Sequence, residues 1–331
     1  MTHRFDTAYH APVLVEEILA LFAGARRALD GTLGGGGHTA AMLEAGMSVT
    51  GIDRDPEAIA EAGARHAEAM RAGTFRVVQG NYADADVLLA EHETFDAILL
   101  DLGVSSHQID VLERGFSFRE GAALGGSMEA ASDESGEMRD ERSLISHPSS
   151  HITTWPSAAS FLNDAPLAEL QHAFKNYGDE PKAARLAREI EHRRAHRPFA
   201  IADDLVGAIR AVLGPRSGPG DFARLFQAVR IAVNGELEGL ARALPILRDK
   251  LAPQGVFAVI AYHSGEDRLV KQAFREWALS CVCPPKQPMC TCRGRPLGTL
   301  LTRKPISATD AEVARNVRAR SAHLRAFRRE A

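Results

Sequence analysis

Four consecutive glycines lie in the stretch Asp30-Gly31-Thr32-Leu33-Gly34-Gly35-Gly36-Gly37-His38. Glycine loses more conformational entropy on folding than any other residue. A folded protein therefore keeps such a run where the backbone must turn tightly and let a ligand come close. The run predicts a ligand-binding loop.

The residues on either side place this loop inside a strand–helix–strand unit. Residues 27–30 are predicted to form a buried strand, residues 39–45 a helix, and residues 49–53 a second strand that ends in Asp53. Amide groups at the helix start face a bound nucleotide, and the acid accepts hydrogen bonds from its ribose. The motif Gly35-x-Gly37-x-x-Ala40 also fits the dinucleotide pattern, so NAD and other adenosine ligands both stay open.

Three further apolar stretches are predicted to be strands, at residues 75–82, 95–103 and 256–263. Ligands of parallel sheets bind at the carboxyl ends of the strands. Four side chains are expected to surround one crevice there: Asp30, Asp53, Tyr82 and Asp101.

The strand pattern stops after residue 108 and returns only at residue 256, which predicts a discontinuous α/β domain. We expect residues 1–115 and 220–331 to form the sheet domain. Its second part is expected to begin with one long helix from residue 222 to 251. We expect residues 116–219 to form an inserted, mostly helical domain on the substrate side. Within it, residues 121–156 are poor in large apolar side chains, which predicts a mobile segment.

Overall composition is that of an ordinary globular protein of 331 residues, with 45% hydrophobic and 25% charged residues. No signal-like N-terminus and no membrane-length apolar run is visible, so a cytoplasmic protein is expected. The net charge of −4 excludes a general attraction to nucleic acid. Arginines are dense in the last twenty residues, which indicates either a local anion-binding surface or a solvated helix face.

Two strand ends carry candidate catalytic groups. Asp101 lies near the end of the strand predicted at residues 95–103. A carboxylate at this place can hold an amine or a ribose, although it can also cap the next segment. His263 follows the last predicted strand and opens His263-Ser264-Gly265-Glu266-Asp267-Arg268; a structural role for this imidazole is as plausible as a catalytic one.

All four cysteines fall in two C-x-C pairs, Cys281-Val282-Cys283 and Cys290-Thr291-Cys292. They can form a four-thiolate zinc knuckle or two reactive thiol pairs. The spacing differs from the usual C-x2-C pairs, so the pattern assigns no metal to the protein.

Taken together, the motifs resemble the bacterial 16S rRNA cytosine-N4 methyltransferases, which use S-adenosylmethionine. The resemblance covers most of the chain, and the motifs follow one another in the same order as in the family. It rests on residues 30–38, Gly51-Ile52-Asp53-Arg54-Asp55-Pro56, Leu99-Leu100-Asp101-Leu102-Gly103-Val104-Ser105-Ser106, residues 113–118, Phe226-Gln227-Ala228-Val229-Arg230-Ile231-Ala232-Val233-Asn234, residues 263–268, residues 300–305 and residues 318–321.

This resemblance implies a Rossmann-like class I methyltransferase sheet, with 16S rRNA of the small ribosomal subunit as the partner. It implies that Gly36, Gly37 and His38 contact the methionine end of S-adenosylmethionine and that Asp53 binds its ribose. Tyr82 is then expected near the adenine. Asp101 and Gln108 complete the site, and the basic C-terminal segment is expected to contact RNA.

In three places the sequence departs from the family pattern. Residues 121–128 replace a usual Pro-Leu-Asp-Met-Arg-Met run and are followed by extra residues. Gly265 replaces a leucine and Val317 a proline. We expect the first departure alone to affect activity or substrate entry.

The predicted activity is methyl transfer from S-adenosylmethionine to the exocyclic N4 of a cytidine in the decoding centre of 16S rRNA. Asp101 is the expected hydrogen-bond acceptor for the amine and His263 the second candidate. Two alternatives remain: an NAD-dependent oxidoreductase, and an RNA-binding ribosome-assembly factor with weak or no turnover.

Overall fold

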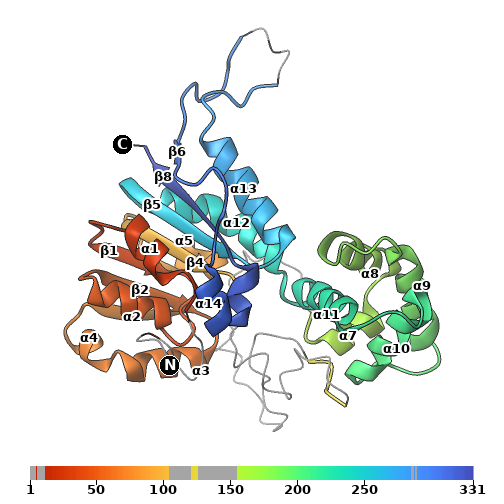
Figure 1. Ribbon diagram of the computed structural model, residues 1–331. Coiled ribbons are helices and arrows are strands. Elements are labelled where there is room, and N and C mark those ends of the chain that lie inside the picture. The colour runs from red at the N-terminus through yellow and green to blue at the C-terminus, as the bar shows by residue number, and fades with distance from the viewer. Residues whose placement is uncertain are drawn as a thin grey trace, which may run out of the picture. The chain divides into compact units, whose positions relative to one another are not determined.

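The computed structural model describes Phe5 and residues 12–103, 121–125, 155–284, 287 and 289–330 (Figure 1). Gln108 and most of the predicted mobile segment 121–156 lie outside these residues. The chain divides into two compact units, one comprising residues 1–105 and 240–331 and the other residues 106–239. Within the described residues, no helix combines the length and apolarity needed to cross a lipid bilayer.

The first unit is built on one sheet in the order β3-β2-β1-β4-β5-β8-β6, with β7 paired to β8. Strands β1 to β5 are parallel, and β8 runs antiparallel to its neighbours. The bounds are β1 Arg27–Asp30, β2 Ser48–Asp53, β3 Phe75–Gln79, β4 Phe95–Asp101, β5 Leu251–Ala261, β6 Gly298–Leu300, β7 Ile306–Ser307 and β8 His323–Arg329. The expected discontinuous, Rossmann-like sheet is confirmed.

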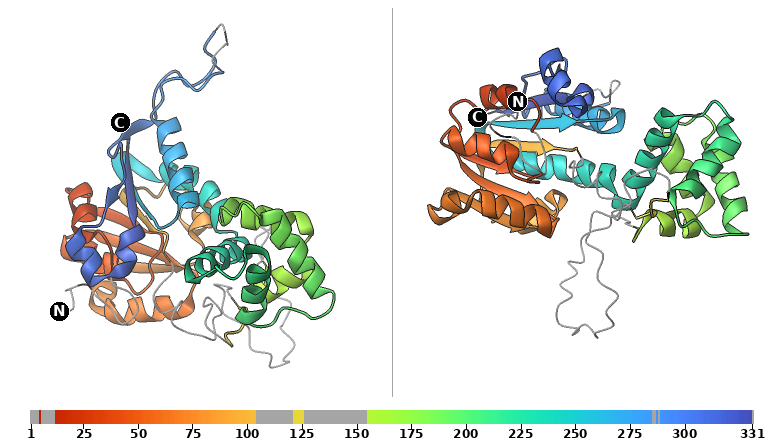
Figure 2. Two further views of the ribbon diagram at one scale, coloured as in Figure 1. Left: turned by 45° about the vertical axis from the view of Figure 1, so that its right-hand side comes forward. Right: turned by 60° about the horizontal axis from the view of Figure 1, so that its bottom comes forward.

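Helices cover both faces of this sheet, as the right-hand view of Figure 2 shows. On one face, Ile18, Phe22 and Met42 pack with Leu99 and Ile260. That face carries α1 Val15–Leu21, α2 Gly37–Glu44 and α3 Pro56–Arg65, which α4 Ala67–Arg71 follows.

The other face is built around aromatic side chains of α13 (Ser264–Trp277). The ring centroid of Phe274 lies 5.5 Å from that of Phe257 in β5 and 5.6 Å from that of Phe327 in β8. These contacts tie β8, which comes last in the chain, to the centre of the sheet. The unit also contains η1 Tyr82–Asp84, α5 Ala85–Leu88, α14 Asp310–Arg315 and η4 Val317–Ser321.

The second unit is helical where it is described. Its elements are α7 Ala158–Asp164, α8 Leu167–His172, the π-helical turn η3 Ala173–Tyr177, α9 Ala183–Arg194, α10 Ala202–Leu213 and α11 Pro219–Asn234. Its core contains Phe161, Phe174, Leu186 and Ile209.

Two expectations about the end of this unit were wrong. The helix predicted from residue 222 to 251 is two helices, α11 and α12 (Glu236–Asp249), because Gly235 adopts a left-handed φ of 58° between them. The predicted boundary at residue 220 also comes too early. Helix α11 buries Phe222 and Leu225 in the helical core and so belongs to the second unit, which extends to residue 239 in the start of α12.

The start of β5 also differs from the prediction. The strand was predicted to begin at residue 256, but α12 ends at Asp249 and β5 begins at Leu251, so Pro253-Gln254-Gly255 lies inside β5. Gln254 takes a positive φ of 63°, and the register with β4 shifts between Phe95 and Ala97. The turn-forming residues therefore make an irregularity inside the strand.

Candidate active site

The carboxyl ends of the parallel strands bring the predicted residues to one edge of the sheet. Asp30, Asp53 and Asp101 are the last residues of β1, β2 and β4, while Tyr262 and His263 follow β5. The strand order reverses between β1 and β4, and such a switch point leaves a crevice for a ligand.

The glycine loop is fixed to this edge by backbone hydrogen bonds. Gly31 N–H donates to the Leu99 carbonyl at 2.9 Å, and Leu33 N–H donates to the Ile52 carbonyl at 3.0 Å. Gly34 N–H donates to Asp53 Oδ2 at 2.8 Å. The loop is therefore held in place by β4, β2 and the acid at the end of β2.

Gly36 is a position in the loop where both the backbone conformation and a close neighbour disfavour a side chain. Its φ is +73°, and a Cβ there would lie 2.7 Å from Nε2 of His66. Nε2 of His66 donates to the Gly36 carbonyl at 3.0 Å, and burial lowers the pKa of His66, which keeps the imidazole neutral for this bond. The absence of a side chain at Gly36 therefore lets the His66 ring pack against the loop at the start of α2.

Helix α2 begins at Gly37, with Gly36 as its N-cap. The first amide groups of a helix have no acceptor in a preceding turn, so the N–H groups of Gly37, His38 and Thr39 can bind a carboxylate or phosphate. These N–H groups suit the methionine carboxylate of S-adenosylmethionine, as they would suit other small anions.

Asp53 has a double role in this geometry. Its Oδ1 accepts from Asp55 N–H at 2.9 Å and its Oδ2 from Gly34 N–H, which fixes the orientation of the carboxylate. Each oxygen keeps a second lone pair for a ribose hydroxyl. Burial raises the pKa of Asp53 above its ordinary value, even though both backbone bonds lower it.

Asp101 and His38 meet at the switch point. Nε2 of His38 lies 2.9 Å from the Val13 carbonyl, an arrangement that requires a proton on Nε2, and Nδ1 lies 3.6 Å from Asp101 Oδ2. Both side chains are 6% exposed. The buried Tyr262 has its pKa raised well above its ordinary value by burial and by the neighbouring Asp101 carboxylate, so it stays a neutral hydroxyl. The His38 imidazole and the Tyr262 hydroxyl thus both lie close to the Asp101 carboxyl group.

His263 has a structural task as the N-cap of α13. Its Nδ1 accepts from the N–H groups of Gly265 and Glu266 at 3.2 and 3.4 Å. Nε2 lies 3.0 Å from Glu266 Oε1, and the other Glu266 oxygen accepts from Tyr262 N–H. Both ring nitrogens therefore face groups of the helix start, which favours the structural interpretation left open above.

Tyr82 lies beside the glycine loop. A Cβ on Gly31 would be 3.5 Å from the Tyr82 Cβ, so the first residue of η1 is close to the end of β1. Of the remaining predicted residues, Gln108 lies outside the described part of the chain.

Four residues that complete the site escaped the sequence interpretation. The Thr32 hydroxyl accepts from Asp101 N–H at 2.7 Å, and the Thr39 hydroxyl donates to Asp30 Oδ2 at 2.8 Å. His66 and Tyr262 are the others. Only Tyr262 carried a usable signal, its place at the end of a predicted strand; the other three act through contacts between distant segments.

The basic C-terminal end differs from what its composition indicated. Residues 323–329 form the strand β8, which was not expected. Arg325 is 6% exposed and makes two bonds to Asp267, at 2.6 and 2.9 Å. Although burial raises it, the Arg325 guanidinium holds the pKa of Asp267 below its usual value. Arg325 is therefore a buried ion-pair residue, unlike the exposed arginines of the same segment.

With this geometry established, comparison with known proteins is informative. Three relatives named ribosomal RNA small subunit methyltransferase H align along nearly the whole chain. The Gemmatimonas aurantiaca protein is 58% identical over 322 residues, covering 97% of this chain and 95% of the relative. The Heliobacterium modesticaldum protein is 41% identical over 329 residues (96% and 97%), and the Myxococcus xanthus protein 40% identical over 321 residues (96% and 96%).

The sequence model of the MraW methylase family matches residues 7–138 and 150–330, which include both parts of the sheet unit and most of the helical one. A methylase family leaves the oxidoreductase interpretation of Gly35-x-Gly37-x-x-Ala40 without support. On both the family model and these relatives, the chain belongs to the MraW methylase family.

Proposed function

We propose that this protein transfers a methyl group from S-adenosylmethionine to the exocyclic N4 of a cytidine in the decoding centre of 16S rRNA. The observation that carries the proposal is the convergence of the glycine loop, Asp53 and Asp101 at one sheet edge, in a chain of a methylase family. The names of its relatives, which specify the small-subunit ribosomal RNA, support the substrate class. Because small subunits assemble in the cytoplasm, the proposal also implies a cytoplasmic enzyme.

Cofactor binding is assigned to the loop and to the two neighbouring strand ends. Backbone N–H groups of Gly37 and His38, at the start of α2, bind the methionine carboxylate, and Gly36 is the N-cap that precedes them. Asp53 accepts from the ribose hydroxyls with the oxygens that Gly34 and Asp55 orient. Tyr82, beside Gly31, is assigned to the adenine, and we retain Gln108 as a further contact.

Asp101 is assigned the catalytic task. S-adenosylmethionine supplies an electrophilic methyl carbon on a positively charged sulfur. The lone pair of the cytidine amine is delocalised into the ring, so an acceptor must bind one N–H and aim the nitrogen at that carbon. Asp101, oriented through its N–H by Thr32 and adjacent to His38 and Tyr262, can accept this bond and the proton that leaves the nitrogen.

His263 is kept as the second candidate catalytic residue. Its Nδ1 accepts from backbone N–H groups of α13, so the ring proton of His263 is on Nε2. We expect its replacement to act mainly by weakening the start of α13, beside Tyr262.

The test is methylation of small subunits that lack the modification. Full-length protein is incubated with S-adenosylmethionine and such subunits, and the rRNA nucleosides are identified by mass spectrometry. N4-methylcytidine at one decoding-centre position is expected, with Asp101→Ala losing turnover while retaining cofactor affinity. Cofactor and rRNA binding without methylation of any nucleoside would instead support the assembly-factor alternative.

RNA contacts are assigned to the arginines that lie near this edge. The carboxyl end of β5 pairs with the start of β8, Ala261 with His323, and Arg318 and Arg320 immediately precede that start in η4. Arg328 pairs with Val256 at the opposite end of β5. Arg318 and Arg320 are therefore the C-terminal arginines placed to contact a phosphate of RNA at the active site.

A further inference from the structure

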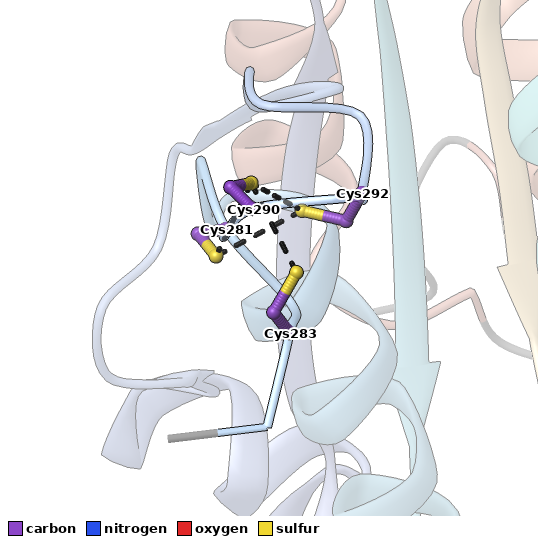
Figure 3. Close-up of side chains that lie close together, drawn as sticks. All are labelled: Cys281, Cys283, Cys290 and Cys292. Atoms are coloured by element: carbon purple, nitrogen blue, oxygen red, sulfur yellow. Dashed lines mark hydrogen bonds between the residues drawn. The ribbon is translucent and has the colours of Figure 1, made fainter. Parts of the chain in front are cut away.

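The four cysteines of the chain converge in the segment between α13 and β6 (Figure 3). Cys281 Sγ lies 3.8 Å from both Cys290 Sγ and Cys292 Sγ. Cys290 Sγ lies 3.5 Å from Cys292 Sγ and 3.9 Å from Cys283 Sγ. The two remaining sulfur pairs are also within 4.8 Å. Each C-x-C pair therefore faces the other.

These separations match four thiolates around a single metal ion. A zinc–sulfur bond of about 2.3 Å sets the edge of a regular tetrahedron at about 3.8 Å. A disulfide would require about 2.05 Å between two sulfurs, and all four cysteines are free. An iron–sulfur cluster binds its thiolates through separate iron atoms, which holds the sulfurs farther apart than they lie here.

A backbone N–H group is directed at one of the four sulfurs. Val282 N–H donates to Cys292 Sγ at 3.4 Å, which brings the first pair against the second. Thiolates are the form in which cysteine binds metal.

This segment has little else to hold it. In Figure 1 it extends from the end of α13 away from the sheet. Leu279, Val282 and Met289 are 51%, 39% and 76% exposed. The base is closed by Leu297 N–H, which donates to the Trp277 carbonyl at 2.7 Å, and by Arg293, which donates to the Leu279 carbonyl. Beyond this base, Gln287 Nε2 donates to Thr291 Oγ1 at 2.8 Å, and the four cysteines lie close enough to share one ligand.

We propose that Cys281, Cys283, Cys290 and Cys292 bind one Zn²⁺ ion as a closed four-thiolate structural site. Four sulfur ligands in tetrahedral arrangement select zinc or iron among common metals. Four protein ligands leave no open position for a substrate, which separates this site from the methyl-transfer chemistry. Binding joins two chain stretches that have almost no buried apolar contacts, so the metal supplies the folding energy of the segment.

Metal content of the full-length protein tests the proposal without any substitution. The protein is produced without a histidine tag in medium containing both zinc and iron, and its metals are measured by mass spectrometry. One zinc per chain, released by a thiol-modifying reagent and detected with a zinc-sensitive dye, is expected. Iron at one per chain, metal well below one per chain, or cysteines oxidised to disulfides would each overturn it.

A pair of neighbouring substitutions tests the ligands. Cys283→Ser should lose most of the zinc and make the segment 278–297 more sensitive to limited proteolysis, whereas Val282→Ala, one residue away, should retain one zinc per chain. Affinity for S-adenosylmethionine should be unchanged in both, because the cofactor edge lies at β1, β2 and β4. Zinc retained in Cys283→Ser at the original affinity would contradict the four-thiolate assignment.

Cobalt provides a further readout. Replacing the metal in the wild-type protein with Co²⁺ should give the visible absorption and thiolate-to-metal charge-transfer bands of a tetrahedral cobalt thiolate. A spectrum of six-coordinate cobalt would contradict the site.

Discussion

Asp53 is the residue whose environment bears most directly on cofactor affinity. It ends β2, receives two backbone N–H bonds and has a pKa raised by burial. A carboxylate binds ribose hydroxyls through charge-assisted bonds, and these weaken when it takes up a proton. The raised pKa brings that protonation to a higher pH than in an exposed aspartate.

We therefore predict that affinity for S-adenosylmethionine falls on acidification, beginning above the ordinary titration range of aspartate. Asp53→Asn keeps an oxygen for Gly34 N–H but does not titrate. It should bind more weakly at neutral pH, by about 1.5–3 kcal/mol for the loss of bonds to a charged group, and show a flatter pH profile. Calorimetry from pH 7 downward measures both. Parallel pH profiles for the wild type and Asp53→Asn would remove Asp53 from the cofactor site. Burial also raises the pKa of Asp30, but both proteins contain Asp30, so it does not cause a difference between their profiles.

Thr32 supports Asp101 through one hydrogen bond. Its hydroxyl accepts from Asp101 N–H at 2.7 Å. In Thr32→Val the shape is conserved but the amide loses its acceptor, which should cost about 1–3 kcal/mol of folding free energy. Thr32→Ser, which keeps the hydroxyl, is the matched control. Urea unfolding measures the difference, and equal stability of the two variants would show that the bond contributes nothing.

In the glycine loop, Gly36 combines a left-handed backbone conformation with a close neighbouring side chain. Gly36 and Gly46 have similar φ values, +73° and +86°, but a Cβ at Gly46 would meet no atom within 4 Å. The left-handed conformation costs roughly 1–2 kcal/mol for alanine at either position. The contact with His66 is therefore the feature that separates the two sites.

Gly36→Ala is predicted to lose more stability than Gly46→Ala and, unlike it, to weaken S-adenosylmethionine binding. The added methyl group must displace the His66 ring, which breaks its bond to the Gly36 carbonyl and shifts the start of α2. Thermal unfolding and cofactor titration on both variants are the measurements. If Gly46→Ala weakens the cofactor equally, backbone strain alone accounts for the effect.

Over the whole molecule, the net charge of −4 means that any attraction to RNA must be local. Because residues 323–329 form β8, the C-terminal arginines lie in three different environments. Arg320 lies near the cofactor edge, Arg325 is paired inside the unit, and Arg328 lies at the opposite end of β5. Composition alone treats these residues as equivalent.

Arg320→Ala should weaken rRNA binding and reduce its salt dependence by about 0.7–0.9 log units per decade of salt. Arg328→Ala, an equally exposed arginine a few residues away, should leave both unchanged. Neither should alter S-adenosylmethionine affinity. Binding measured over a series of salt concentrations compares the two, and identical salt slopes would contradict the assignment of RNA contacts to the cofactor edge.

Local patterns were enough to predict the parallel strands, the glycine loop, the acids at the strand ends and the interruption of the sheet. In each case the signal lies within a few consecutive residues: an apolar run for β4, a glycine run before α2, an acid where β2 stops. Parallel strands also share one direction, so their carboxyl ends, and the side chains they carry, meet at one edge without further information.

Contacts between distant segments decided what these patterns could not. The pairing of β8 with β5 turned a basic tail into a buried strand and enclosed Arg325 beside Asp267. The boundary between the two units lies after α11, and not before it as predicted, because the apolar side of α11 packs on other helices of the helical unit. The sequence places the two cysteine pairs on one short segment, but the path of the chain brings their sulfurs together, since a side chain's neighbours depend on where the backbone returns.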